Sequence, residues 1–116
     1  MRILGASLAL TFTLSAATVS GPYDGLYRYR NQSCNPNMLG MDGGPVKIQE
    51  NVFIGVEMGC ELTNPTNIRG MNATLYDGKC GGEGEEWEGR YMVMKSHHGI
   101  YWIHNEFITE FLRCLQ

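Results

Sequence analysis

The sequence predicts an all-β domain, built as a small antiparallel meander barrel or sandwich of six to seven strands with two disulfides. Short segments of alternating apolar and polar residues recur about every 8–12 residues, separated by turns rich in Gly, Asn and Pro. No segment after residue 20 shows a convincing helical period. The four cysteines form an even number in a small chain with an export signal.

Residues 1–20 have the features of a cleaved signal peptide. Met1-Arg2 supplies a positive end, and residues 3–15 form an apolar run that is shorter than the roughly 20 residues of a membrane span. Small residues follow, so we expect cleavage between residues 17 and 21. Residues 21–116 would then form one domain, periplasmic or secreted, with no membrane attachment after cleavage.

The expected mature domain is acidic. The chain has nine basic and twelve acidic residues, and Arg2 lies in the predicted signal peptide, which leaves eight against twelve and a net charge of −4. This charge gives no basis for binding nucleic acid or an anionic membrane. A cationic partner is compatible with it.

The first strand is predicted at residues 23–30, where aromatic residues alternate with others. A loop rich in Asn, Gly and Pro follows. Residues 46–49 and 52–62 are then expected to pair as a hairpin around Glu50-Asn51. In the second of these segments, VFIGVEMGCEL, even-numbered residues such as Ile54 are apolar, which predicts one central strand with that face in the core. We expect it to act as scaffold.

The second half of the chain is interpreted in the same way. Pro65 and its Asn and Thr neighbours predict a break after residue 62, because proline removes a backbone donor. Residues 77–86, DGKCGGEGEE, are expected to form the longest flexible loop. Further strands are predicted at residues 68–76, 87–95, 100–104 and 107–114. A helical turn is the alternative for the last of these.

The cysteines allow three disulfide connectivities. Their wide spacing, without any C-x-x-C pair, disfavours a zinc site. We prefer Cys34–Cys60 together with Cys80–Cys114, each of which would close a loop of a few tens of residues. Such loops correspond to about 3–4 kcal/mol of stabilisation by loop entropy.

The acidic segment is the first candidate for a function. Glu83, Glu85 and Glu86 precede Trp87, and Arg90 follows. A flexible charged segment next to a large aromatic side chain is common in recognition surfaces. Its spacing does not match a calcium-binding loop. A solvated, negatively charged loop is favoured over calcium binding, and pairing of Glu83 or Glu85 with Arg90 is an intermediate alternative.

Histidines offer a weaker candidate. His97 and His98 fall in a predicted turn and His104 at the end of the next strand, and with a nearby carboxylate they could hold zinc or copper. A surface turn is the favoured interpretation. No nucleophile motif or fixed pair of carboxylates is recognisable, so we expect no catalysis and no cofactor.

Aromatic residues cluster early and late in the chain. They could line a shared pocket if the first and last strands are neighbours, but a role in the core is the favoured interpretation. The residues concerned are Tyr23, Tyr27, Tyr29, Trp87, Tyr91, Tyr101 and Trp102.

The succession YDGLYRYR, Cys34, GGPVKI, GVEMGCELTNP, LYDGKCGGEGEEW, Arg90 and Cys114 resembles a set of small exported proteobacterial proteins of unassigned function. A weaker likeness is to periplasmic inhibitors of c-type lysozyme, which are small disulfide-bonded barrels with a Ser-Gly-x-x-Tyr loop. Residues 88–91, Glu-Gly-Arg-Tyr, are the nearest match and lack both the serine and the spacing.

These observations predict an exported, non-catalytic binding domain with an envelope protein, an extracellular protein or a small ligand as its partner. The contact surface would be the acidic segment and its aromatic neighbours. An inhibitor of a cationic hydrolase such as lysozyme is one alternative. A metal-dependent enzyme or metal carrier is the other.

Overall fold

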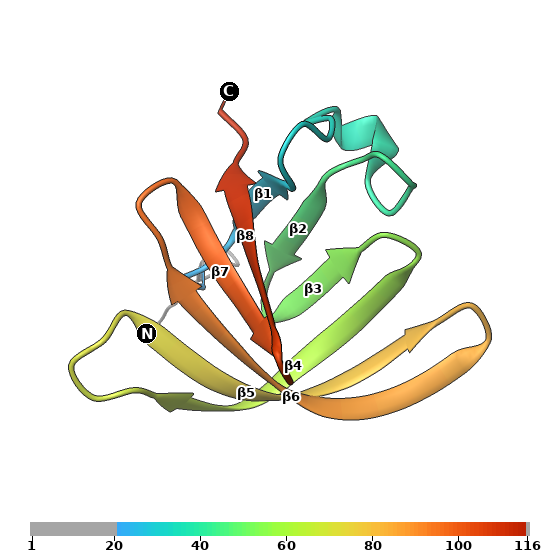
Figure 1. Ribbon diagram of the computed structural model, residues 1–116. Coiled ribbons are helices and arrows are strands. Elements are labelled where there is room, and N and C mark those ends of the chain that lie inside the picture. Colours follow the sequence, from blue (N-terminus) through green and yellow to red (C-terminus); the bar gives the residue numbers. More distant parts are fainter. Residues whose placement is uncertain (1–20, 116) are drawn as a thin grey trace, which may run out of the picture.

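The computed structural model describes residues 21–115, and the predicted signal peptide lies outside the described residues. The chain forms eight antiparallel strands that close into a barrel in simple sequence order, and β1 pairs with β8 (Figure 1). The all-β prediction is therefore confirmed, with a barrel rather than a sandwich and eight strands rather than six to seven. The strands are β1 Gly25–Arg28, β2 Val46–Gln49, β3 Val52–Gly55, β4 Met58–Asn67, β5 Ala73–Gly82, β6 Glu85–Lys95, β7 Gly99–His104 and β8 Phe107–Arg113, with a short 3-10 helix, η2, at Pro36–Met38.

The predicted hairpin between residues 46–49 and the following strand is confirmed, since Gln49 pairs with Val52 across the Glu50-Asn51 turn. The prediction of one strand over residues 52–62 is wrong. The chain turns at Val56-Glu57 and Gly55 pairs with Met58, which divides the segment into β3 and β4.

This turn changes which residues face the core. Phe53 is buried in β3 while Ile54 is half-buried, whereas Cys60 and Leu62 are buried in β4. Odd-numbered residues therefore point inward before the turn and even-numbered residues after it. Because the outward Ile54 and Val56 are also apolar, the alternation continues through the turn in the sequence.

The break predicted at Pro65 is also wrong, because β4 continues to Asn67 with a shift of register between Thr63 and Thr66. Proline is tolerated at such irregularities, since no ladder hydrogen bond is required from it there. The next strand starts at Ala73 rather than at residue 68. Thr74 and Tyr76 of this strand are buried.

Residues 77–86 form the ends of two paired strands and not a flexible loop, and only Glu83-Gly84 lies between β5 and β6. The glycines have a packing role. A Cβ on Gly78 would lie 2.6 Å from the ring of Tyr91, so the ring occupies the space that a side chain would need. Glycine at position 78 therefore reflects close packing.

Both predicted disulfide pairings are wrong. Cys60 and Cys80 lie directly opposite each other on β4 and β5, and they form the sheet disulfide. Cys34 follows β1 and Cys114 follows β8, and these form the closing disulfide. The pairing of β1 with β8 brings together cysteines that are 80 residues apart. Two disulfides indicate an oxidising compartment.

Tyr23, Tyr27, Tyr91 and Trp102 lie in the barrel interior, as the favoured interpretation of the sequence predicted, whereas Tyr29 is exposed and Trp87 and Tyr101 are half-buried. The rings of Phe53 and Trp102 stack with centroids 4.1 Å apart, and Trp102 packs on Tyr91 at 4.9 Å. Tyr27 is fully buried and donates its hydroxyl hydrogen to the Tyr23 carbonyl oxygen. An eight-stranded barrel has an interior that side chains can fill, so its outer surfaces and rims are the places to search for binding sites.

The C-terminal segment is the strand β8, as predicted, and the alternative of a helical turn is wrong. Residues 96–98, which include the predicted turn at His97 and His98, join β6 to β7, and residues 105–106 join β7 to β8. Within residues 21–115, no helix is long and apolar enough to cross a membrane.

Candidate functional site

The tip of the β5–β6 hairpin is a tight turn with an unusual residue in it. Glu83 and Gly84 both have positive φ, 52° and 80°, and Gly82 pairs with Glu85. This geometry is typical of a two-residue type I′ turn, in which Asn, Asp and Gly are preferred at both positions. A glutamate in the left-handed region costs about 1 kcal/mol relative to glycine.

The β3–β4 turn lies against this hairpin and brings in a second strained glutamate. Glu57 also has a positive φ, 56°. Gly82 allows the contact, since a Cβ on it would lie 2.5 Å from the carbonyl oxygen of Glu57. Together the two turns border an open groove of about 260 Å³, which we call the acidic groove. It is lined by Val56, Glu57, Gly82, Glu83, Glu85 and Trp87.

The acidic groove concentrates negative charge. Hydrogen bonding and repulsion from the Glu83 carboxylate raise the pKa of Glu57, and burial and the charge of Asp42 add to the rise. Within residues 21–115, the one ion pair is between Arg90 and Asp77, so the groove carboxylates have no Lys or Arg partner in the part of the chain described. Their charge is available to a ligand.

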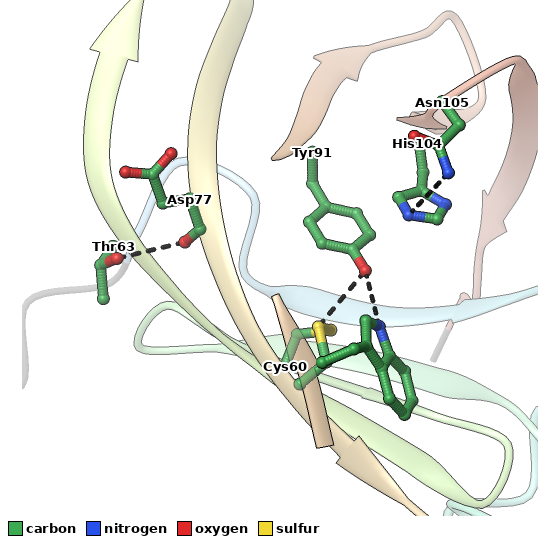
Figure 2. Close-up of a disulfide and its surroundings, with 8 residues drawn as sticks. Cys60, Thr63, Asp77, Tyr91, His104 and Asn105 are labelled. Atoms are coloured by element: carbon green, nitrogen blue, oxygen red, sulfur yellow. Dashed lines mark hydrogen bonds between the residues drawn. A yellow bond between two sulfur atoms is a disulfide. The ribbon is translucent and has the colours of Figure 1, made fainter. Parts of the chain in front are cut away.

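Trp87 connects this groove to the barrel interior. Its indole Nε1–H donates a hydrogen bond to the Tyr91 hydroxyl oxygen at 3.1 Å, and that hydroxyl contacts Cys80 Sγ at 3.3 Å (Figure 2). The hydroxyl is the donor to sulfur, because a disulfide sulfur carries no hydrogen. The indole is half-buried and fixed by this chain of contacts, so it presents a preoriented aromatic surface at the groove.

The structure brings together Glu83, Glu85 and Trp87 of the predicted contact surface and separates the other two residues from them. Glu86 is one step along β6 from Glu85 and therefore points to the other face of the sheet, opposite Gly81. It is exposed, but it does not line the acidic groove.

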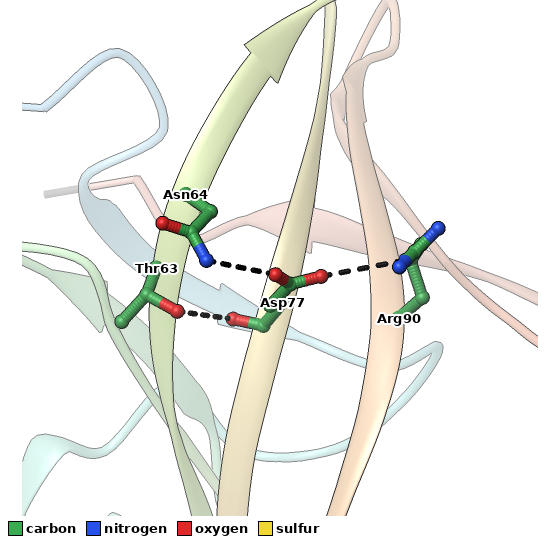
Figure 3. Close-up of polar contacts among 4 residues, drawn as sticks. All are labelled: Thr63, Asn64, Asp77 and Arg90. Carbon is green, nitrogen blue, oxygen red and sulfur yellow. Dashed lines mark hydrogen bonds and ion pairs between the residues drawn. The ribbon is translucent and has the colours of Figure 1, made fainter.

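Arg90 belongs to a different cluster, on the outer surface of β4, β5 and β6. Its Nε lies 3.4 Å from Asp77 Oδ1, so the alternative in which Arg90 pairs with Glu83 or Glu85 is wrong. Asn64 Nδ2 donates to the other oxygen of Asp77 at 2.8 Å, and Thr63 Oγ1 donates to the Asp77 carbonyl oxygen at 3.2 Å (Figure 3). These contacts join three adjacent strands on an exposed face.

The histidines of the metal hypothesis lie at opposite ends of β7. His97 and His98 occupy the β6–β7 turn, whereas His104 ends β7 with its ring stacked on Tyr91 at 4.4 Å between centroids. Among residues 21–115, no group of three or more His, Cys, Asp or Glu side chains is arranged to hold a metal ion.

Comparison with known proteins found no matching protein family, no matching curated protein and no matching solved structure. The four residues nearest to the Ser-Gly-x-x-Tyr loop of the lysozyme inhibitors, 88–91, lie within β6. They are strand residues, and Tyr91 points into the core.

Glu57 is the residue of the acidic groove that the sequence interpretation missed. The prediction of one scaffold strand over residues 52–62 gave Glu57 no role in binding. The available signal was the pair of glycines at 55 and 59, which bracket the Val56-Glu57 turn. Even with the turn identified, the register of β4 on β5, in which Gly59 pairs with Gly81, is needed to place Glu57 against Glu83.

Proposed function

We propose that this protein is an exported, non-catalytic binding domain, periplasmic or secreted, whose acidic groove receives a basic side chain of a partner protein. One observation carries the proposal. Glu57 and Glu83 repel each other and both occupy a backbone conformation that favours Gly or Asn. Strained residues that weaken the fold are found preferentially at binding and catalytic sites.

The groove has the features that recognition of Lys or Arg requires. Its three carboxylates, from Glu57, Glu83 and Glu85, accept charge-assisted hydrogen bonds. Trp87 adds an indole face for a cation–π contact, worth about 0.5–2 kcal/mol depending on desolvation. Val56 supplies an exposed apolar rim for the aliphatic part of a long basic side chain.

A cationic hydrolase such as lysozyme is the first partner to test, because an acidic barrel with this groove complements a basic enzyme. Binding of c-type lysozyme should be measured by isothermal titration calorimetry at low and physiological salt, with a turbidity assay of cell-wall lysis beside it. A short oligolysine peptide tests the simpler case of basic side chains without a folded partner.

The decisive comparison uses two pairs of charge-removing variants on the β5–β6 hairpin. The groove set is Glu83→Gln with Glu85→Gln. The control set is Glu86→Gln and Glu88→Gln, which lie on the same strand and lie outside the groove lining. We expect the groove set to weaken binding by at least tenfold and the control set by little beyond the general loss of charge. Equal weakening by both sets, or no binding of either probe, would refute the proposal.

A further inference from the structure

The β5–β6 hairpin extends beyond the end of β7, which leaves part of β6 without a neighbouring strand on one side. β6 pairs with β5 along residues 85–94, whereas its pairing with β7 starts only at Tyr91. Figure 1 shows the hairpin projecting from the barrel at the lower right. In the part of the chain that the structure describes, no strand pairs with the other side of residues 85–89, which we call the free edge.

The register of β6 on β5 shows which backbone groups point to the free edge. The Lys95 N–H donates to the carbonyl oxygen of Asn72, directly before β5, at 2.9 Å, so the backbone of Lys95 faces β5. Successive residues of a paired strand direct their hydrogen-bonding groups to opposite sides, and the register is continuous along this hairpin. Odd-numbered residues of β6 therefore bond to β5, and the N–H and C=O groups of Glu86 and Glu88 point to the free edge.

The free edge lacks the features that protect another strand edge of this barrel from pairing. β3 pairs with β4 only as far as Glu61, so the later part of β4 also has an unpaired side. That side contains Pro65 and the register shift between Thr63 and Thr66, and both disrupt pairing. Residues 85–89, EEWEG, contain no proline and keep a continuous register. The free edge is therefore able to accept an added strand.

The charge of the free edge determines which kind of strand it favours. Glu85, Glu86 and Glu88 are exposed, and residues 85–89 contain no Lys or Arg. A second copy of this chain would bring glutamates against glutamates, and like charges on paired strands repel. A segment that carries Lys or Arg is attracted by the same charges. Because exposed charge pairs contribute little individually, the backbone hydrogen bonds of an added strand are the contacts to test.

The free edge borders the acidic groove. Glu85 and Trp87 belong to the free edge and also line that groove. Trp87 lies opposite Cys80, whose side chain is in the core, so the indole is on the inner face of the hairpin. Glu86 and Glu88 alternate with it and face outward. A residue that paired opposite Trp87 would point to the inner face, where the groove carboxylates lie.

From these features we propose that the partner presents its basic side chain on an extended segment that pairs with β6 at the free edge. The N–H and C=O groups of Glu86 and Glu88 bond to the backbone of that segment. A Lys or Arg opposite Trp87 enters the acidic groove. This inference rests on the proposed function, because the groove supplies the site for that side chain. Recognition of the side chain alone would leave the backbone groups of the free edge exposed to water.

The first test follows backbone amide hydrogen exchange by NMR, without and with saturating oligolysine. We expect the exchange of the Glu86 and Glu88 amides to slow by roughly tenfold or more on binding. The amides of Glu85 and Trp87 should change little, because they already face β5.

The outcomes separate this inference from the proposed function. If oligolysine binds but the Glu86 and Glu88 amides are not slowed, pairing at the free edge is refuted and the acidic groove alone accounts for binding. If oligolysine does not bind, both fail. Protection of the same amides that increases with protein concentration, in the absence of oligolysine, would assign the free edge to a second copy and overturn the proposal.

A second test removes one backbone donor from the free edge. Glu88→Pro eliminates an N–H that makes no bond to β5, and proline is tolerated at such edge positions, so the melting temperature should stay close to that of the wild type. Glu88→Gln is the matched control, because it removes the same charge and keeps the N–H. We expect Glu88→Pro to bind oligolysine about fivefold more weakly than Glu88→Gln. Equal affinities of the two variants would overturn the proposal.

A comparison of two peptides needs no variant of the domain. Oligolysine with a fully N-methylated backbone keeps its side-chain charges but donates no backbone hydrogen bond. We expect it to bind the wild-type domain roughly tenfold more weakly than ordinary oligolysine. Equal binding of the two peptides would show that the side chains alone are recognised, which contradicts pairing at the free edge.

Discussion

Replacing Gly82 with alanine should separate the two turns that form the acidic groove. The new Cβ would lie 2.5 Å from the Glu57 carbonyl oxygen and 2.9 Å from Met58 Cβ, and both contacts belong to the β3–β4 turn. Ordinary contact requires about 3.5 Å, so the turn must move by roughly 1 Å. Backbone atoms cannot yield as a flexible side chain does.

The expected cost of this overpacking is about 1–3 kcal/mol of the free energy of unfolding. For a domain of this size, each 1 kcal/mol corresponds to a fall of about 4–8 °C in the melting temperature. The measurement is thermal and urea unfolding followed by circular dichroism. Displacing Glu57 from Glu83 should also return the pKa of Glu57 toward its ordinary value and weaken the binding of lysozyme or oligolysine.

Gly81→Ala is the matched control, one residue away on the same strand. Its Cβ would lie 3.5 Å from the Glu85 carbonyl oxygen, which is an ordinary contact. We expect little loss of stability and unchanged binding. If both alanine variants lose the same stability, or if Gly82→Ala leaves the pKa of Glu57 where it is in the wild type, the close approach of the two turns is refuted.

Three further predictions concern the core, the disulfides and pH. Gly78→Ala should cost about 1–3 kcal/mol, because its Cβ would lie 2.6 Å from the Tyr91 ring; wild-type stability in urea unfolding would contradict this packing. Removing the closing disulfide should lower the free energy of unfolding by about 4.5 kcal/mol, and removing the sheet disulfide by about 3 kcal/mol, because loop entropy grows with the separations of 80 and 20 residues. The reverse order in calorimetry would argue against loop entropy as the main cause. The pKa of Glu57 is raised in the folded state above its ordinary value of 4.5. The folded state therefore holds the Glu57 proton more tightly, and this stabilises the fold below pH 4.5 and is lost as the pH rises through the raised pKa. Glu57→Gln should remove this part of the pH dependence of the free energy of unfolding.

The sequence predicted the fold class because strand alternation and turn residues are local signals. The hairpin of residues 46–55 shows this, since its apolar pattern and its Glu50-Asn51 turn are contained in ten residues. The Val56-Glu57 turn was missed because Ile54 and Val56 are apolar although they face away from the core. The local apolar pattern therefore does not show which face of β3 is buried; the closed barrel determines that.

The Gly-rich segment shows a different limit. Positions 78 and 82 need glycine because the Tyr91 ring and the β3–β4 turn occupy the space of a side chain there. Tyr91 lies on the next strand, and the β3–β4 turn is more than 20 residues away in sequence. Composition alone favours a flexible loop there. The disulfides were mispaired for the same reason, since the pairing of β1 with β8 that joins Cys34 to Cys114 is a property of the closed barrel.

The candidate site was predicted in part. Glu83, Glu85 and Trp87 were identified from charge beside an aromatic residue, which is visible in the sequence. Glu57 was not, because its proximity to Glu83 depends on how two hairpins lie together.

The most direct test of the account is an NMR pH titration of the Glu57 side-chain carboxyl, first in the free domain and then with saturating lysozyme or oligolysine. The account predicts a pKa above 4.5 in the free domain, caused mainly by Glu83, and a fall when a basic side chain enters the acidic groove. Binding should accordingly weaken as pH decreases through the raised pKa, because protonation removes a carboxylate that contacts the ligand. An ordinary pKa in the free domain, or a raised pKa that binding does not lower, would contradict the central claim.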